Sequence, residues 1–251
     1  MTGKSILIKT KEELELLRRA GRILAVIAKE LRTYIREGMT TQEIDNRASQ
    51  LIAAQKVKSA FKGYRGFPGS VCVSLNEEVV HGIPGKKVLK DGDIASIDLG
   101  IVANEYYADT AFTVGIGEVN DAHRRLIKVT EDSLEKGIAQ AQVGNHLSDI
   151  SFAIQDYVES NNFSVVRDFV GHGIGKMLHE EPEVPNFGLP HAGPLLKEGM
   201  VLAIEPMVNL GAWQTRILDD GWTVVTQDGQ PSAHFEHTVA ITKTGPEILT
   251  K

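Results

Sequence analysis

The chain has 251 residues, of which 42% are hydrophobic and 24% are charged, a composition typical of ordinary globular proteins. Its 33 acidic and 27 basic residues give a net charge of −6, so the overall charge does not predict binding to nucleic acid or to an anionic membrane surface. The single cysteine, Cys72, excludes an internal disulfide and a zinc site built from several thiolates.

Residues 1–12 lack the apolar core of a signal peptide, and no apolar run is long enough to span a membrane. We therefore expect a cytoplasmic protein without a membrane segment. No Pro/Ser-rich linker or low-complexity segment divides the sequence. Residues 1–251 are expected to form a single domain.

Two capping boxes predict the first two helices. The first runs from Thr10 to Glu13 and opens an amphipathic helix that stops at Gly38, and the second runs from Thr40 to Glu43 and opens a helix that ends near Gln55. Strand-like segments follow, at residues 70–74, 94–102 and 106–114. A third, long amphipathic helix is predicted from residue 121 to about residue 142.

The order of elements then repeats. Gly144 parallels Gly38, residues 149–150 parallel residues 43–44, and residues 201–205 parallel residues 94–98 at nearly the same spacing. The tripeptide His-Gly-Ile occurs at His81 and again at His172. We expect two related helix-helix-sheet halves, approximately residues 10–115 and 119–245, related by a pseudo-two-fold axis. The fold class is α+β, a curved and largely antiparallel sheet with helices on its outer face.

Acidic residues interrupt segments that otherwise resemble buried strands. A hairpin centred on Ala103 and Asn104 would place Asp98 and Asp109 directly opposite each other on one face. Two like charges in that position destabilise a half-buried sheet, so a cation is expected between them. Glu205 and Glu236 occupy similar settings in the second half.

Four carboxylates carry a charge of about −4, which a pair of divalent ions balances. His172 lies between glycines that let backbone and metal approach closely, and it is the best nitrogen ligand. An oxygen-rich set with one imidazole suits Mn, Fe(II), Co or Zn and does not choose among them. Two adjacent metal ions can activate a water and polarise a carbonyl group, so amide hydrolysis fits this set.

Competing motifs fail. The segment around Gly171 and Lys176 breaks the phosphate-loop pattern, and neither His-Glu-x-x-His nor Gly-x-Ser-x-Gly is present. Cys72 lies in an apolar strand, where a packing role outweighs a nucleophilic one.

With these residues in this order, the sequence closely resembles the type I methionine aminopeptidases over essentially its whole length. The supporting motifs are Gly66-Phe-Pro-Gly-Ser-Val-Cys72, Asn76-Glu-Glu-Val-Val-His81-Gly-Ile-Pro84, Ser96-Ile-Asp98-Leu-Gly, Gly171-His172-Gly-Ile-Gly, Ile204-Glu205-Pro and Glu236-His-Thr. The resemblance implies the pita-bread fold, removal of the N-terminal methionine from nascent chains when the second residue is small, and two divalent ions per chain. It also implies a monomer with no specific nucleic acid partner and, at most, transient contact with the ribosome.

The resemblance further implies roles for individual residues. Asp98, Asp109, His172, Glu205 and Glu236 would bind metal, with Asp109 and Glu236 bridging the ions and Glu205 also relaying the proton of the attacking water. His81 and His179 would contact the scissile amide and its carbonyl oxygen. The side-chain pocket would be lined by Tyr64, Phe67, Cys72, Leu178 and Trp222, although ordinary core packing would equally explain these apolar residues.

The sequence departs from the commonest family pattern at Arg65, Phe67 and Leu178, where His, Tyr and Phe are frequent, and at Phe61 on the pocket rim. These positions affect the shape of the pocket and not the metal ligands. Three rivals stay open: an X-Pro dipeptidase or aminopeptidase P, a non-catalytic binding protein on the same scaffold, and a two-metal phosphoesterase. The first usually carries an additional N-terminal domain, the second usually loses metal ligands, and the third lacks an evident basic cluster.

Overall fold

A computed structural model describes residues 5–251. Residues 1–4, which belong to the segment predicted not to be a signal peptide, lie outside the described part. The first half of the chain contains α1 (Lys11–Tyr34), α2 (Thr41–Ala54), β1 (Lys58–Ser59), the 3₁₀ turn η1 (Tyr64–Gly66), β2 (Cys72–Leu75), β3 (Glu78–Val80), β4 (Ile94–Ala103) and β5 (Tyr106–Gly115). The second half contains α3 (Asp121–Gln140), α4 (Leu147–Ser160), β6 (Ser164–Val165), β7 (Gly171–Gly173), β8 (Glu180–Val184), β9 (Val201–Ile204), β10 (Met207–Asn209), β11 (Thr215–Ile217), β12 (Val224–Thr226), β13 (Ser232–His234), β14 (Glu236–Thr242) and β15 (Gly245–Ile248).

The helices begin where the capping boxes predict. The Thr10 hydroxyl accepts a hydrogen bond from the Glu13 amide at 3.2 Å, and the Glu13 carboxylate accepts one from the Thr10 amide at 2.9 Å. Thr40 and Glu43 make the same pair of bonds at the start of α2. Between the helices the chain turns at Gly38, whose φ of +81° disfavours any residue with a side chain.

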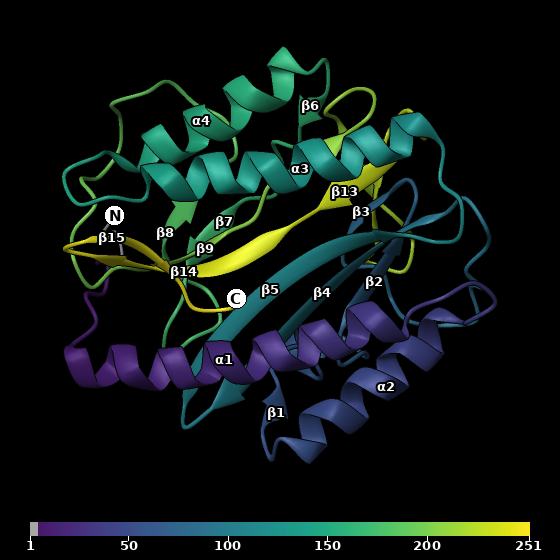
Figure 1. Cartoon of the computed structure of the whole chain (residues 1–251), viewed down its shortest axis with the longest axis horizontal. Coiled ribbons are helices and arrows are strands. Elements are labelled where there is room, and N and C mark those ends of the chain that lie inside the picture. The colour runs from purple at the N-terminus through teal and green to yellow at the C-terminus, as the bar shows by residue number, and fades with distance from the viewer. Residues whose placement is uncertain (1–4) are drawn as a thin grey trace.

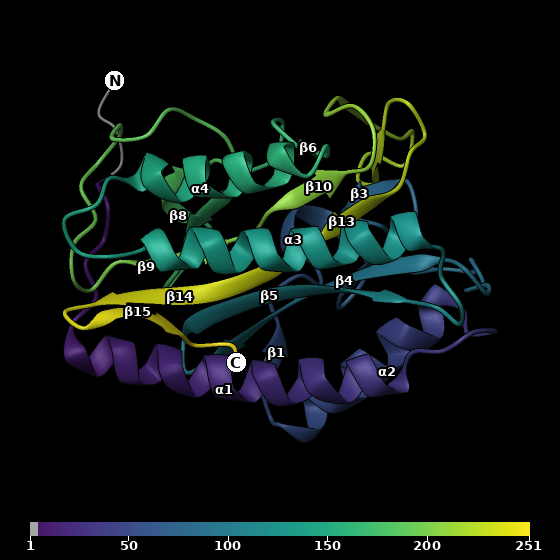
Figure 2. The same cartoon turned by 45° about the horizontal axis from the view of Figure 1, so that its top comes forward.

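The central sheet has nine strands in the order β1-β4-β5-β14-β9-β7-β8, with β2 also paired to β4 and β15 to β14, and its strand pairs are antiparallel. Two short three-stranded sheets, β13-β10-β6 and β11-β12-β3, complete the structure. Figure 1 and Figure 2 show α1 and α2 along one half of this sheet and α3 and α4 along the other half, and residues of α1 and α3 line one groove over the same face of β5 and β14. The fold is therefore α+β, as predicted.

A continuous apolar core joins the helices to the sheet. Leu24, Ile27 and Leu31 of α1, Ile97 of β4 and Ile154 of α4 belong to the same cluster, and each is at most 1% exposed. Burying side chains of this size stabilises the fold by about 1.5–3 kcal/mol each. Strands from both halves of the chain meet where β5 pairs with β14.

The hairpin prediction was wrong in its register. Gly100 lies opposite Asp109, and Asp98 lies opposite Ala111, so the two acids are diagonal neighbours and not direct partners. The chain reverses at Asn104 and Glu105, whose φ values of 48° and 68° are those of a two-residue hairpin loop. Because the register differs by an even number of residues, both carboxylates still project from the same face of the sheet.

We propose that the two halves of the chain, approximately residues 10–115 and 119–245, are an internal duplication. The two helices before the main strands in each half support it, as does the junction of β5 with β14 between the halves. In the described residues 5–251, no helix combines the length and the apolar character needed to cross a bilayer.

Candidate metal centre and active site

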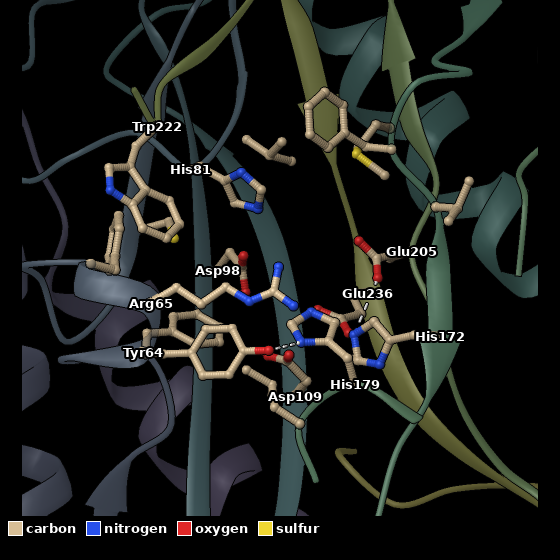
Figure 3. Close-up of a pocket in the computed structure, with 18 residues that line it drawn as sticks. Tyr64, Arg65, His81, Asp98, Asp109, His172, His179, Glu205, Trp222 and Glu236 are labelled. Atoms are coloured by element: carbon tan, nitrogen blue, oxygen red, sulfur yellow. Dashed lines mark hydrogen bonds and ion pairs between the residues drawn. The ribbon is translucent and has the colours of Figure 1, made fainter. Parts of the chain in front are cut away.

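A cavity of about 200 Å³ lies on the face of the sheet from which Cys72, Asp98 and Asp109 project, and every site residue predicted from the sequence lines it. Its lining consists of Phe61, Tyr64, Arg65, Phe67, Cys72, Val80, His81, Asp98, Asp109, Phe169, Val170, His172, Leu178, His179, Glu205, Met207, Trp222 and Glu236. Figure 3 shows the carboxylates and imidazoles converging from strands of both halves. The roles of these residues stay predictions, but their assembly in one place is a property of the fold.

The five predicted metal ligands come from five segments. Asp98 and Asp109 project from β4 and β5, His172 from β7 and Glu236 from the start of β14, while Glu205 directly follows β9. Donor atoms of Asp109, His172 and Glu236 lie within 4.8 Å of one another, and each of these residues is at most 7% exposed. Glu205 is close by, with its Oε1 3.6 Å from Nε2 of His172. Such a spacing suits ligands that share one or two cations.

Two carboxylate oxygens of this cluster have no hydrogen-bond partner among the described residues. Asp98 Oδ1 and Glu236 Oε1 are buried without a hydrogen bond. Burial raises the pKa of Asp98 to about 7, and burial and the neighbouring carboxylates raise the pKa values of Asp109 and Glu236 well above the ordinary range. Buried acids with unused oxygens need compensating positive charge, because an unpaired buried charge is strongly disfavoured. The residues present therefore fit a pair of divalent ions.

His172 is held in a form that can bind metal. Its Nδ1 lies 2.9 Å from the carbonyl oxygen of Gly173, so Nδ1 carries the proton and donates it to that bond. Nε2, which faces Glu205, then has a free lone pair. Burial, together with the nearby His179, lowers the pKa of His172 to about 3, so the ring is neutral at physiological pH. A neutral imidazole oriented by a backbone carbonyl is the usual form of a histidine ligand.

These pKa shifts predict how the stability of the metal-depleted protein depends on pH. The raised pKa values of Asp98, Asp109, Glu205 and Glu236 mean that the folded protein holds protons that the unfolded chain has lost. Protonation of these acids stabilises the metal-depleted folded state. This contribution to the free energy of unfolding is lost as pH rises through the folded-state pKa values of the acids. The lowered pKa values of His81, His172 and His234 act in the opposite sense, but only below about pH 6.5, where an unfolded histidine is protonated.

Between about pH 6.5 and pH 8 only the carboxylates contribute. The free energy of unfolding of the metal-depleted protein should therefore fall as pH rises in this window, by about 1.4 kcal/mol per pH unit for each proton difference. Saturating divalent ion should reverse the trend, since the ion binds the deprotonated acids. Denaturant melts at several pH values, with and without ion, measure both slopes. A flat profile for the metal-depleted protein would show that these acids are not buried as described.

His81 and His179 line the same cavity as the five predicted metal ligands. The hydroxyl of Tyr64 lies 2.9 Å from Nδ1 of His179, and the rings of His172 and His179 are 4.3 Å apart (Figure 3). His81 has a φ of +60°, and its ring packs edge-on against Phe169 at 5.6 Å and Trp222 at 6.2 Å. A histidine held in this unfavourable backbone region indicates a site where the surrounding structure imposes the geometry.

The apolar end of the cavity contains the predicted pocket residues. Phe67, Cys72 and Leu178 are at most 4% exposed, and the ring of Trp222 meets Phe67 edge-on at 5.1 Å. Cys72 lies directly opposite Asp98 in the pairing of β2 with β4, so the apolar wall begins beside the carboxylates. Burial, followed by the charges of Asp98 and Asp109, raises the pKa of the Cys72 thiol well above its usual value. The raised pKa favours the protonated thiol, which is in keeping with a packing role for Cys72.

The segment that carries His179 is anchored by a buried ion pair. Lys9 and Glu180 join their side chains, which are 5% and 1% exposed, and the Lys9 amide donates to the carbonyl of Gly199 at 2.7 Å. Oε1 of Glu180 also accepts from the Met177 amide at 3.2 Å. The pair thus ties the segment before α1 to the residue next to His179. Nothing in the local sequence around either residue predicts this contact.

Sequence reasoning missed Phe169, which lines the cavity, and His234, which lies beside Glu205 outside that lining, whereas Arg65 was anticipated only as a departure from the family pattern. His234 is 1% exposed, with its Nε2 3.7 Å from Oε2 of Glu205 and no hydrogen-bond partner. The sequence signal for His234 was its position two residues before Glu236, which suggests the same face of one strand. In the structure the two residues belong to different strands, because β13 ends at His234 and β14 begins at Glu236. Arg65 points across the cavity mouth in Figure 3, and its φ of +48° lies in the left-handed region.

Comparisons with known proteins point to one peptidase family. A profile of metallopeptidase family M24 matches residues 15–243. Methionine aminopeptidase 1 of Bacillus subtilis is 55% identical over 246 residues, which cover 98% of this chain and 99% of that protein. The methionine aminopeptidase of Clostridium perfringens is 54% identical over 245 residues, with 98% of each chain covered. The crystal structure of methionine aminopeptidase from Thermotoga maritima has a TM-score of 0.97 and 48% identity, and the match covers 98% of this chain and 100% of that one.

The solved neighbours share the pita-bread fold predicted from the resemblance. Of the three rivals, none is favoured by relatives at this level of identity over nearly the full length. The chain belongs to metallopeptidase family M24 and, within it, to the methionine aminopeptidases.

Proposed function

We propose that the protein removes the N-terminal methionine from peptides and nascent chains whose second residue is small. The observation that supports this most strongly is the meeting of unpaired buried carboxylates with an apolar pocket inside a single cavity. The carboxylates supply a place for hydrolytic chemistry, and the pocket supplies a place for one unbranched apolar side chain.

Five side chains would hold the metal pair: Asp98, Asp109, His172, Glu205 and Glu236. When bound, two divalent ions lower the pKa of a water molecule and polarise the scissile carbonyl. By the resemblance to the family, Asp109 and Glu236 would serve both ions, and their donor atoms lie within 4.8 Å of each other and of a donor atom of His172. The identity of the ions, among Co, Mn, Fe(II) and Zn, is not selected by this ligand set.

Glu205 would relay the proton from the attacking water to the leaving amine. Its carboxylate lies between the imidazoles of His172 and His234, at 3.6 Å and 3.7 Å. Without the ions, burial, followed by the charge of Asp98, raises the pKa of Glu205 well above its ordinary value, so this carboxylate has a strong tendency to take up a proton. A carboxyl group with this tendency can accept a proton at one stage and return it at the next.

His179 would donate a hydrogen bond to the carbonyl oxygen as negative charge develops there. If the Tyr64 hydroxyl donates to Nδ1, the proton of the neutral ring resides on Nε2, the form required of such a donor. Burial and the nearby Arg65 lower the pKa of His179, so the ring is neutral. Burial and His179 lower the pKa of His81 to about 4, and this second neutral ring would contact the scissile amide.

The pocket explains the preference for methionine. Tyr64, Phe67, Cys72, Leu178 and Trp222 form a wall of polarisable groups that suits a thioether. Each methylene in such a pocket discriminates by about 1–3 kcal/mol, so norleucine should be a poorer but measurable substrate. Selection against a large second residue is steric, because the ligand cluster and the imidazoles leave little room next to the scissile bond.

This function predicts a steep dependence on the second residue. Release of methionine from Met-Ala and Met-Thr peptides should exceed release from Met-Leu and Met-Lys peptides by at least about 10²-fold, since a steric clash is sharper than a missing methylene. Quantifying free methionine by chromatography measures this. Equal rates from all four peptides would contradict the steric explanation, and no release from any would return the X-Pro activity to consideration.

We further propose that the enzyme acts as a monomer, in the cytoplasm, with transient contact with the ribosome. The location and the ribosome contact follow from the substrate, since nascent chains first expose their N-terminal methionine where they are synthesised, and the monomeric state is what the family resemblance implies.

A further inference from the structure

A second group of metal-binding side chains lies at the start of α4, outside the cavity described above. Among residues 5–251, His146, Asp149 and His191 bring one donor atom each within 4.8 Å of the others. His146 precedes the first residue of α4, Asp149 lies in its first turn, and His191 belongs to the connection between β8 and β9. The group shares no residue with the catalytic cavity.

The backbone holds all three residues in place. The Asp149 carboxylate accepts hydrogen bonds from the amides of His146 and His191, each at 2.7 Å. Ser148 makes two more bonds to the same connection, from its hydroxyl to the Ala192 carbonyl at 2.8 Å and to its hydroxyl from the Ala192 amide at 2.7 Å. Segments far apart in sequence are therefore fixed against each other before any ion binds, which reduces the entropic cost of binding.

The side chains are spaced as ligands of one ion. Nδ1 of His191 lies 3.3 Å from Oδ1 of Asp149. Tetrahedral zinc with bonds of about 2.0–2.1 Å separates neighbouring donors by about 3.3 Å. The two imidazole rings are 6.4 Å apart and nearly perpendicular, at 75°, so they do not stack against each other. Small rotations of the exposed His191 side chain would let its donor atom bind the same ion as the donor atoms of His146 and Asp149.

The local backbone and charge support this arrangement. His191 has a φ of +62°, a left-handed conformation that is unfavourable for most residues with a side chain. Burial alone would raise the pKa of Asp149, but the amides of His191 and His146 and the neighbouring imidazoles hold it below its usual value. The carboxylate is thus charged and offsets the positive end of the helix dipole, which would otherwise oppose a cation at this position.

We propose that His146, Asp149 and His191 bind one transition-metal ion, of the class represented by zinc, in a mononuclear site separate from the catalytic pair. Two imidazoles and one carboxylate form a borderline ligand set that suits zinc better than magnesium or calcium. The ion would join the β8–β9 connection to α4 and leave one coordination position for water.

The proposal is tested by zinc stoichiometry and by chemical protection of histidines in the full-length protein. His191→Asn removes the imidazole while keeping a residue that tolerates positive φ, and His146→Ser removes the other imidazole while keeping a good helix cap. Equilibrium dialysis against Zn²⁺, followed by elemental analysis, should find one fewer zinc per chain in each variant than in the wild type. His123→Gln, at another helix start, is the matched control and should bind as much zinc as the wild type.

Carbethoxylation of histidines, read by peptide mass spectrometry, locates the ion. Zinc should protect His191 and His146 in the wild type but should leave His146 of the His191→Asn variant reactive. The rate of methionine release should be unchanged in both variants at a fixed concentration of the catalytic metal. Equal zinc content in wild type and variants, or no protection of His191, would overturn the proposal and leave an ion pair between His191 and Asp149 as the whole role of the cluster.

Discussion

Asp98→Asn or Glu236→Gln is expected to abolish turnover while leaving the fold intact. Changing a residue that only orients a metal ligand typically costs about 10–100-fold in affinity or activity, so loss of a ligand itself should cost more than about 10²-fold. Each change removes one negative charge from a cluster whose members raise one another's pKa values. The metal-depleted variants should therefore be at least as stable as the metal-depleted wild type at pH 8.

The test measures metal content, activity and denaturant melts on the same preparations. Glu105→Gln is a matched control, because it makes the same chemical change as Glu236→Gln at the exposed tip of the β4–β5 hairpin. The control should retain full activity and metal content. A variant at position 98 or 236 that keeps both would show that the two-metal assignment is wrong.

Replacement of His81 or His179 should cut kcat by about 10²-fold or more without loss of metal, the scale of a lost acid, base or oxyanion donor. His179→Ala is a direct test, since the segment that carries His179 is anchored independently by Glu180 and Lys9. His81→Asn is preferable to alanine at position 81, because asparagine tolerates the φ of +60° better than other non-glycine residues.

A third variant separates catalysis from packing. Tyr64→Phe removes the hydroxyl that bonds Nδ1 of His179 while preserving the aromatic ring, so it should lower kcat by a smaller factor than His179→Ala. Metal analysis accompanies each assay. Loss of metal from the His81 or His179 variants would mean that these residues belong to the ligand set and that their predicted role is incorrect.

Much of the fold is predictable because its signals are local. Thr10 with Glu13 and Thr40 with Glu43 mark helix starts through bonds that span only three residues. The register of β4 with β5 was not predictable in this way, because the hairpin loop of Asn104 and Glu105 requires positive φ at both residues. Asparagine commonly adopts that conformation, so Asn104 is a signal for it, whereas glutamate is not. The pairing of Ala103 with Tyr106 imposes the conformation on Glu105.

The site shows the same division. Carboxylates inside apolar strands are visible in the sequence because they violate the pattern around them, and Asp98, Asp109, Glu205 and Glu236 were found in that way. The ion pair of Lys9 with Glu180 and the approach of His234 to Glu205 connect segments far apart in the chain. Such contacts depend on how the strands are arranged, and no local periodicity encodes them.

The central claim is that the cluster of Asp98, Asp109, His172, Glu205 and Glu236 serves the hydrolysis of an N-terminal methionyl bond. The most direct test assays the metal-depleted protein on Met-Ala and Ala-Pro peptides, before and after addition of each of Mn²⁺, Fe²⁺, Co²⁺ and Zn²⁺. We predict no cleavage without metal, recovery of methionine release from Met-Ala with at least one ion, and no cleavage of Ala-Pro with any. Cleavage of Met-Ala by the metal-depleted protein, or preferential cleavage of Ala-Pro after metal is restored, would contradict the account.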